Sequence, residues 1–121
     1  MTRVIKIEKI GGPEVLKIKN VDLKEPDPDQ VIIDQKAIGL NYIDTYHRTG
    51  MYPLPLPAGI GLEAAGIIKK VGSKVKNWSV GDHVAYAGVP IGAYAESRAY
   101  PADKLVKVPD HVTSEIAASI M

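Results

Sequence analysis

Short runs of alternating apolar and polar residues, each ended by glycine or proline, constrain the fold of this chain most strongly. Val4 to Ile10 alternates with a period of two, the sequence Gly-Gly-Pro interrupts the pattern, and Val15 to Leu23 resumes it. Alternation of this kind places apolar side chains on one face of a strand, so the two runs predict a hairpin with one solvated face. With 11 glycines, 9 prolines and no phenylalanine, the chain is expected to form a turn-rich domain with a core of Val, Ile, Leu and Ala.

Five further apolar runs predict strands, and turn residues separate them. They are Gln30 to Leu40, Gly59 to Ile68, His83 to Tyr86, Ala93 to Tyr100 and Lys104 to Val108. About seven short strands in 121 residues indicate one mainly β domain, a barrel or sandwich of antiparallel character.

One polar segment interrupts the strands. Asn41 is followed three residues later by Asp44, which approximates a capping box, and the pattern predicts a short helix from Tyr42 to about Arg48 that stops at Gly50. The proline-rich segment that follows, residues 53–57, is expected to lie extended on the surface.

The side chains of this segment are the candidate functional groups. Asn41 is either a helix cap or an amide that faces a ligand. Tyr42, Tyr46 and Tyr52 either pack in the core or offer a flat apolar ring and a hydroxyl to a planar ligand. The local pattern leaves both interpretations open.

Glu63 is the lone carboxylate between Met51 and Ile68. A buried carboxylate needs a partner, so Glu63 is expected either to pair with Arg48 or another cation, or to titrate abnormally. A buried structural pair is the favoured interpretation.

Composition argues against several functional classes. The formal net charge is +1 and the lysines are dispersed, so no nucleic-acid surface is indicated. There is no cysteine, and His47, His83 and His111 are too far apart for a compact ligand motif, so no metal site is expected. No glycine-rich phosphate-binding loop is present.

The chain lacks a signal-peptide pattern and a membrane helix, and we expect a cytoplasmic protein.

Several motifs together resemble a known family. They are Gly12-Pro13-Glu14-Val15-Leu16, the run from Gly39 to Tyr52, the run from Gly61 to Gly66, Val71-Gly72-Ser73, and the run from Gly81 to Tyr86. In this order they resemble the N-terminal GroES-like domain of NADPH-dependent quinone oxidoreductases, the zeta-crystallin-like, zinc-independent branch of the medium-chain dehydrogenase/reductase superfamily. The resemblance implies a GroES-like, partly open β-barrel, mainly β with short helices, over residues 1–112. Residues 113–121 would begin a linking helix toward a Rossmann domain that is absent from this chain.

The resemblance also implies a chemistry. Zinc-dependent relatives carry a cysteine at the position of Asn41 and a histidine at that of Leu62, so a zinc-free enzyme is implied. NADPH would reduce a quinone substrate. Asn41, Tyr42 and Tyr46 would border the nicotinamide, and Tyr46 with Tyr52 would line the quinone pocket as the catalytic residues.

The chain ends at Met121 inside an apolar segment without a helix stop signal. We therefore expect a truncated or excised piece of a longer enzyme, inactive alone and without tight NADPH binding, whose full-length family forms homodimers. Two alternatives are an NADPH-dependent enone or alkenal reductase domain, and a stand-alone GroES-like interaction module.

Overall fold

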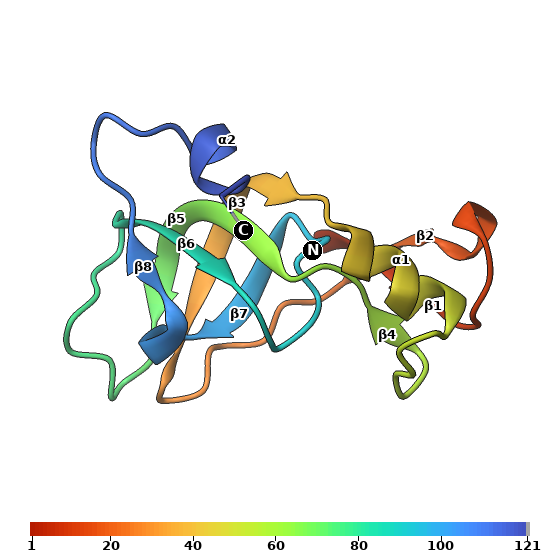
Figure 1. Cartoon of the computed structure of the whole chain (residues 1–121). Helices are drawn as coiled ribbons and strands as arrows, with labels where there is room; N and C mark the ends of the chain where they lie inside the picture. Colours follow the sequence, from red (N-terminus) through yellow and green to blue (C-terminus); the bar gives the residue numbers. More distant parts are fainter. Residues whose placement is uncertain (121) are drawn as a thin grey trace.

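A computed structural model describes residues 1–120 as a mainly β fold with two short α-helices (Figure 1). The strands are β1 (Thr2–Ile7), β2 (Lys17–Val21), β3 (Gln30–Gly39), β4 (Ala58–Gly59), β5 (Glu63–Val71), β6 (His83–Ala87), β7 (Ser97–Pro101) and β8 (Val106–Lys107). The helices are α1 (Tyr42–Thr49) and α2 (Ser114–Ala117), and Pro13–Val15 and Ala102–Lys104 form single 3₁₀ turns. No helix within residues 1–120 has the length and apolar character needed to cross a membrane.

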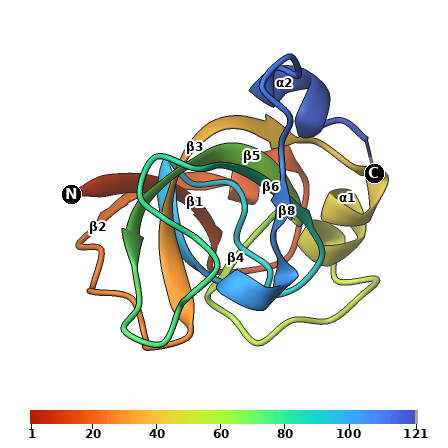
Figure 2. The same ribbon diagram turned by 90° about the vertical axis from the view of Figure 1, so that its left-hand side faces the viewer.

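The strands form two antiparallel sheets, in the orders β2-β1-β4 and β7-β3-β5-β6-β8. A bridge between Val4 and Ala95, together with a 2.8 Å hydrogen bond from Ile5 N–H to the Tyr94 carbonyl, connects the two sheets. In Figure 2, β3 and β5 curve across the upper part of the molecule, and α2 lies outside this curve. The partly open barrel expected from the sequence is therefore confirmed.

The first predicted hairpin is confirmed, although both of its strands are shorter than the alternation suggested. β1 and β2 pair antiparallel from Thr2 opposite Val21 to Lys6 opposite Lys17. The chain between them leaves the sheet and makes the 3₁₀ turn, with Val15 buried at the end of that turn.

The prediction of one strand from Gly59 to Ile68 is wrong. β4 ends at Gly59 and pairs with β1, whereas β5 begins at Glu63 and pairs with β3 and β6. Gly61 lies between them with φ of 98°, in the left-handed region that glycine tolerates, and it redirects the chain from one sheet to the other. Alternation alone does not reveal this change of sheet.

The predicted strand from Ala93 to Tyr100 is also too long, because β7 starts at Ser97. The backbone N–H groups of Ala93 and Tyr94 bond instead to the carbonyls of Gly61 and Ile60. This crossing places Tyr94 close to the first sheet and to helix α1.

The core lies between β3, β5, β6 and β7 and contains the aliphatic residues that the composition predicted. Its fully buried members include Val31, Ile33, Ala64, Ile68 and Val84. Tyr86 and Tyr100 add two buried aromatic rings, stacked with centroids 3.9 Å apart.

Candidate functional site

Helix α1 forms the centre of the candidate site, and its ends follow the predicted chemistry. Asn41 precedes the helix with extended backbone, and the Asp44 side chain accepts a hydrogen bond from the Asn41 backbone N–H at 3.1 Å. Gly50 adopts φ of 86°, and its N–H bonds to the His47 carbonyl at 3.3 Å, which ends the helix. The helix predicted from the sequence is confirmed to within one residue.

The Asn41 side chain contacts a buried carboxylate. Its amide Nδ2 donates to Glu63 Oε1 at 2.9 Å, and Glu63 is only 3% exposed. β3 and β5 position the two residues, because Gly39 and Glu63 are direct partners in that strand pair. Glu63 therefore accepts a hydrogen bond from a neutral amide. The sequence analysis had considered only a cation as its partner.

Two of the predicted tyrosines meet. The rings of Tyr46 and Tyr52 contact edge to face with centroids 5.4 Å apart, and Tyr52 N–H bonds to the Tyr46 carbonyl at 3.1 Å. The centroid of the His47 ring lies 6.1 Å from that of Tyr52. Tyr52 remains 48% exposed, so this pair is partly accessible to a ligand.

Tyr42 lies apart from this pair. It is 84% exposed at the first position of α1, beside Asn41 and Leu40, which is equally exposed. Core packing is therefore excluded for Tyr42. The structure brings Tyr46 and Tyr52 together, and Tyr42 lies one helical turn before Tyr46.

Two cavities flank Asn41. The first, here called the Glu63 cavity, has a volume of about 290 Å³ and is lined by Ala37, Ile38, Gly39, Leu40, Asn41, Glu63, Glu115, Ala118 and Ser119. The second, here called the Asp44 cavity, has a volume of about 300 Å³ and is lined by Leu16, Leu40, Asn41, Tyr42, Asp44, Thr45, Arg48, Ile60 and Tyr94. Leu40 and Asn41 line both cavities, so these two residues lie between the Glu63 cavity and the Asp44 cavity.

Sequence reasoning missed the contact between Tyr94 and Asp44. The Tyr94 hydroxyl donates to Asp44 Oδ2 at 2.6 Å, and Asp44 is only 3% exposed. Burial raises the pKa of Tyr94 above its ordinary value, and the hydrogen bond to Asp44 raises it further. No local sequence pattern links residues that are 50 positions apart, so this contact could not be predicted from the sequence.

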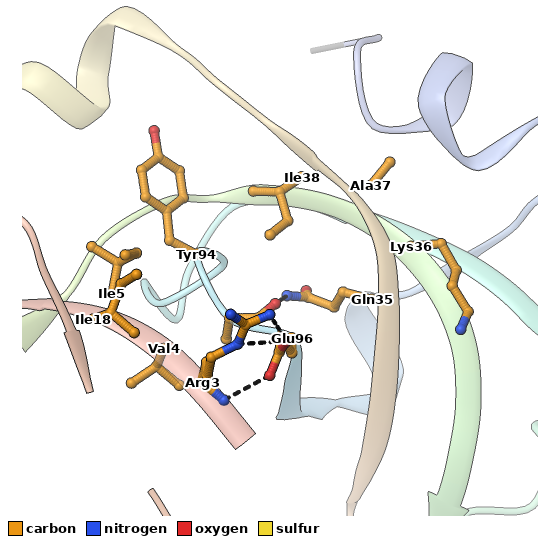
Figure 3. Close-up of a pocket in the computed structure, with 11 residues that line it drawn as sticks. Arg3, Val4, Ile5, Ile18, Gln35, Lys36, Ala37, Ile38, Tyr94 and Glu96 are labelled. Carbon is orange, nitrogen blue, oxygen red and sulfur yellow. Dashed lines mark hydrogen bonds and ion pairs between the residues drawn. The ribbon is translucent and has the colours of Figure 1, made fainter. Parts of the chain in front are cut away.

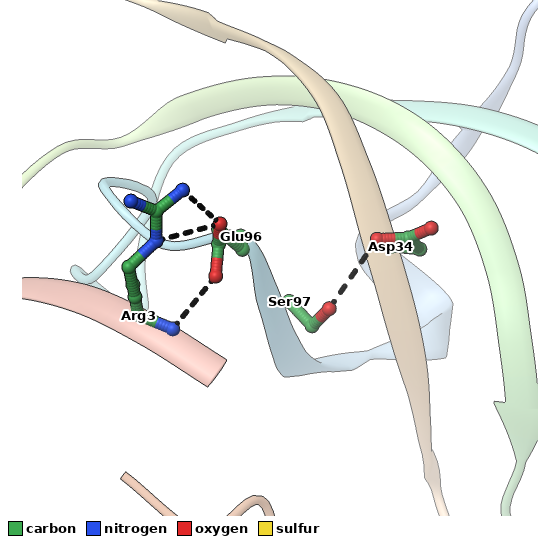
Figure 4. Close-up of polar contacts among 4 residues, drawn as sticks. All are labelled: Arg3, Asp34, Glu96 and Ser97. Atoms are coloured by element: carbon green, nitrogen blue, oxygen red, sulfur yellow. Dashed lines mark hydrogen bonds and ion pairs between the residues drawn. The ribbon is translucent and has the colours of Figure 1, made fainter. Parts of the chain in front are cut away.

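A third cavity, of about 320 Å³, lies between the β1–β2 hairpin and β3 (Figure 3). Its walls are largely apolar, and Val4, Ile5, Ile18 and Ile38 contribute to them. Arg3 and Glu96 form an exposed 2.6 Å ion pair at this cavity, and Ser97 Oγ lies 3.4 Å from Asp34 Oδ1 nearby (Figure 4). Exposed ion pairs are weak, and the polar groups here are already paired with one another. This cavity therefore offers few polar groups that could react with a ligand.

The histidines are separated in space as well as in sequence. His83 Nε2 lies 2.7 Å from Ser114 Oγ and connects β6 to the start of α2. Over residues 1–120, no cluster of three or more His, Cys, Asp or Glu side chains is placed to hold a metal ion.

Comparison with known proteins gives a consistent family. The alcohol dehydrogenase GroES-like domain matches residues 27–110. The quinone oxidoreductase of Pseudomonas aeruginosa is 48% identical over the whole chain. The crystal structure of Escherichia coli quinone oxidoreductase complexed with NADPH superimposes with a TM-score of 0.96 at 45% identity and over 100% of this chain. A 2-haloacrylate reductase from a Burkholderia species is 44% identical over 85% of the chain.

These relatives are much longer than this chain. It covers 38% of the Pseudomonas protein, 37% of the Escherichia coli structure and 32% of the haloacrylate reductase. The family domain itself, however, spans well over half of the chain and includes β3 to β8 and helix α1. The chain therefore belongs to the alcohol dehydrogenase GroES-like domain family.

Proposed function

We propose that this chain is the substrate-side domain of an NADPH-dependent quinone oxidoreductase that works without zinc. The observation that carries the proposal is the arrangement around α1. The Asn41–Glu63 hydrogen bond lies at the start of the helix and the Tyr46–Tyr52 pair at its end. In this proposal residues 1–112 form the domain, and the segment from residue 113 begins the link to a nucleotide-binding domain.

The residues at the start of α1 fit the nicotinamide end of NADPH. Leu40 and Tyr42 present exposed apolar surface beside Asn41, and a flat ring can pack there. The Glu63 carboxylate accepts from the Asn41 amide and thereby fixes its orientation. The chain has no phosphate-binding loop, so the phosphates would be held by protein outside it. When bound, NADPH supplies the hydride.

Tyr46 and Tyr52 would bind and polarise the quinone. Their hydroxyls are the donors that this end of the helix offers to a quinone oxygen, which gains negative charge during reduction. The edge-to-face contact restrains both rings, so little reorganisation is needed when the substrate arrives. Tyr42 would contact the cofactor rather than the quinone, in keeping with its separation from the pair.

A zinc-free site is part of the proposal. The Asn41 amide is engaged with Glu63, and the buried alkyl side chain of Leu62 cannot ligate a metal. Charge stabilisation would therefore rest on hydrogen bonds. We also propose that the whole enzyme is cytoplasmic and homodimeric.

The Burkholderia relative supports a second candidate, an NADPH-dependent reductase of activated alkenes. The 44% identity to a 2-haloacrylate reductase is close to the identity with the quinone oxidoreductases. Such an enzyme would use the same cofactor end, with an enone or alkenal at the tyrosine pair.

A hybrid enzyme separates the two candidates. Residues 1–121 would replace the matching first part of the Pseudomonas aeruginosa quinone oxidoreductase, and kcat/KM would be measured with NADPH and either 1,4-benzoquinone or 2-chloroacrylate. The proposal predicts a higher kcat/KM for the quinone. A hybrid that binds NADPH and reduces only 2-chloroacrylate would establish the second candidate. A hybrid that binds NADPH and reduces neither substrate would refute both candidate functions.

A further inference from the structure

We propose that Tyr94 is a positioning residue of the reductase site and that it holds Asn41 in place through the Asp44 carboxylate. The inference rests on the proposed function, because it gives Tyr94 an indirect role in the binding of NADPH. Three residues carry it, and they come from three separate parts of the chain: the segment before β7, helix α1 and the residue that precedes α1.

The backbone of Tyr94 is fixed where the two sheets meet. Its carbonyl accepts from Ile5 N–H on β1 at 2.8 Å, and its N–H donates to the carbonyl of Ile60, between β4 and β5, at 2.9 Å. The ring packs against Gly61, where an added Cβ atom would clash with it. Figure 3 shows the hydroxyl pointing toward α1. Tyr94 is therefore a firm support for whatever its hydroxyl binds.

The hydroxyl binds a buried carboxylate that has few other donors. Asp44 is only 3% exposed, and its Oδ2 accepts from Tyr94 at 2.6 Å and from the Asn41 backbone N–H at 3.1 Å. Oδ1 accepts no hydrogen bond from residues 1–120. A buried carboxylate depends on such charge-assisted bonds, so the loss of the Tyr94 hydroxyl would leave Asp44 with one donor and without a fixed orientation.

Asp44 in turn orients Asn41. The Asn41 backbone N–H is bound by Asp44, and its side-chain amide is bound by Glu63 at 2.9 Å, so each contact restrains a different part of the residue. In the proposed function, Asn41 borders the nicotinamide. A looser Asp44 would release the backbone of Asn41, and cofactor binding would then have to restore its orientation at a cost in affinity.

The other end of α1 is held by different contacts. Gly11 N–H donates to the Arg48 carbonyl at 3.0 Å, and Tyr52 N–H donates to the Tyr46 carbonyl at 3.1 Å. These bonds are independent of the Tyr94 hydroxyl. Its removal should therefore disturb the cofactor end of the helix and spare the tyrosine pair proposed to bind the quinone.

Tyr94→Phe in the hybrid enzyme tests this separation. We expect the Kd of NADPH, measured by fluorescence titration, to rise about tenfold, because one charge-assisted hydrogen bond to Asp44 is lost. The KM for 1,4-benzoquinone should stay within about twofold. An unchanged Kd for NADPH would overturn the proposal and leave Tyr94 a purely structural residue.

Tyr100→Phe is the matched control for general loss of stability. Tyr100 is 1% exposed, and its hydroxyl donates to the Val89 carbonyl at 3.0 Å, so this change also removes a buried hydroxyl. Tyr100 lines neither cavity beside Asn41, and the Kd of NADPH should stay within about twofold. An equal rise in both variants would mean that the affinity follows stability, which would contradict a positioning role.

A double-variant comparison tests whether Tyr94 acts through Asp44. If it does, Tyr94→Phe should weaken NADPH binding less than about twofold in a hybrid that already carries Asp44→Asn, because the shared contact is already altered. A full tenfold effect in that background would refute the route through Asp44.

Amide hydrogen exchange on the 121-residue chain needs neither the cofactor nor a folded Asp44→Asn variant. Tyr94→Phe should speed exchange of the Asn41 amide about tenfold and leave the Tyr52 amide within about twofold. Unchanged exchange at Asn41 would refute the proposal. A hybrid that binds NADPH and reduces neither substrate would instead refute the proposed function, and the Kd and exchange measurements would still decide the role of Tyr94.

Discussion

At the scale of single residues, buried polar side chains connect strands that are distant in the sequence. The Tyr86 hydroxyl donates to the Gln35 side-chain oxygen, and Gln35 Nε2 donates to the carbonyls of Ala93 and Ala95 at 2.8 and 2.6 Å. The Arg98 guanidinium lies over the Tyr86 ring, 5.5 Å from its centroid. These contacts join β3, β6 and the segment before β7 around one buried hydroxyl.

This network predicts a loss of stability at high pH. Burial raises the pKa of Tyr86 from 10.0 to about 12. Because the folded pKa exceeds the unfolded one, the contribution of Tyr86 is fully present below pH 10 and is lost as the pH rises from about 10 to about 12. The loss amounts to roughly 3 kcal/mol of unfolding free energy.

Urea denaturation across this range, in the wild type and in Tyr86→Phe, measures the effect. The Phe variant should be less stable at neutral pH, since Gln35 loses a partner, but its stability should fall less steeply above pH 10. If the unfolding free energies of the two proteins fell in parallel above pH 10, the ionisation of Tyr86 would not be coupled to unfolding.

The Tyr94 hydroxyl gives a second prediction. Tyr94→Phe removes a donor from the buried Asp44 side chain and should lower the unfolding free energy by about 1–3 kcal/mol in urea denaturation. Tyr42→Phe is the control, because its side chain is 84% exposed, and it should change stability by less than about 0.5 kcal/mol. Equal effects of the two substitutions would mean that the Tyr94 hydrogen bond contributes nothing.

Residue-level prediction from the sequence reached the segment from Asn41 to Tyr52 and the buried carboxylate of Glu63. Asn41, Tyr46 and Tyr52 were identified from one local segment, and the structure places the two tyrosines in contact. Their roles in binding or catalysis stay predictions. Tyr94 was not identified, because its contact with Asp44 depends on how the chain crosses between the two sheets.

At the scale of elements, the β3–β5 pair depends on close backbone approach. A Cβ atom on Gly66 would lie 2.3 Å from the Asp34 carbonyl oxygen and 2.7 Å from Gln35 Cα, both on β3. Only glycine fits there without a shift of one strand. Glu63 lies opposite Gly39 in the same strand pair, beside the candidate site.

A pair of glycine substitutions separates this steric effect from backbone strain. Gly66→Ala should lower the unfolding free energy by about 3 kcal/mol, because the new methyl group would clash with the backbone of β3. Gly81→Ala should cost only about 1–2 kcal/mol, since its φ of 95° is strained for alanine but nothing lies within 4 Å of the new atom. Urea denaturation of both variants checks the order, and a larger loss for Gly81→Ala would contradict it.

Most elements were predictable because their signals are local. The hairpin, β3, β6 and α1 follow from alternation, capping residues and glycine stops within about ten residues each. The sequence analysis missed the division between β4 and β5. The chain passes from one sheet to the other at Gly61, and this residue lies within a continuous apolar run. Pairing of β1 with β4 and of β3 with β7 is long-range, and no single segment encodes it.

At the scale of the whole molecule, the fold places one polar helix at the junction of two sheets. The GroES-like barrel predicted from the motifs is confirmed, and the family match covers β3 through β8 and α1. The Asn41 amide, the exposed start of α1 and the tyrosine pair lie along this one helix. In the proposed function, this helix would form one wall of the reductase site, and the other wall would belong to protein outside the chain.

The most direct test of this account is quinone reduction by the hybrid enzyme with Tyr46→Phe and Tyr52→Phe together. Removal of both donors should lower kcat with 1,4-benzoquinone by about 10²-fold or more, while the affinity for NADPH stays within about twofold. Arg3→Lys serves as the control, because Arg3 lines neither cavity beside Asn41, and it should leave kcat unchanged. A double variant that binds NADPH and reduces quinone at the rate of the unsubstituted hybrid would contradict the account.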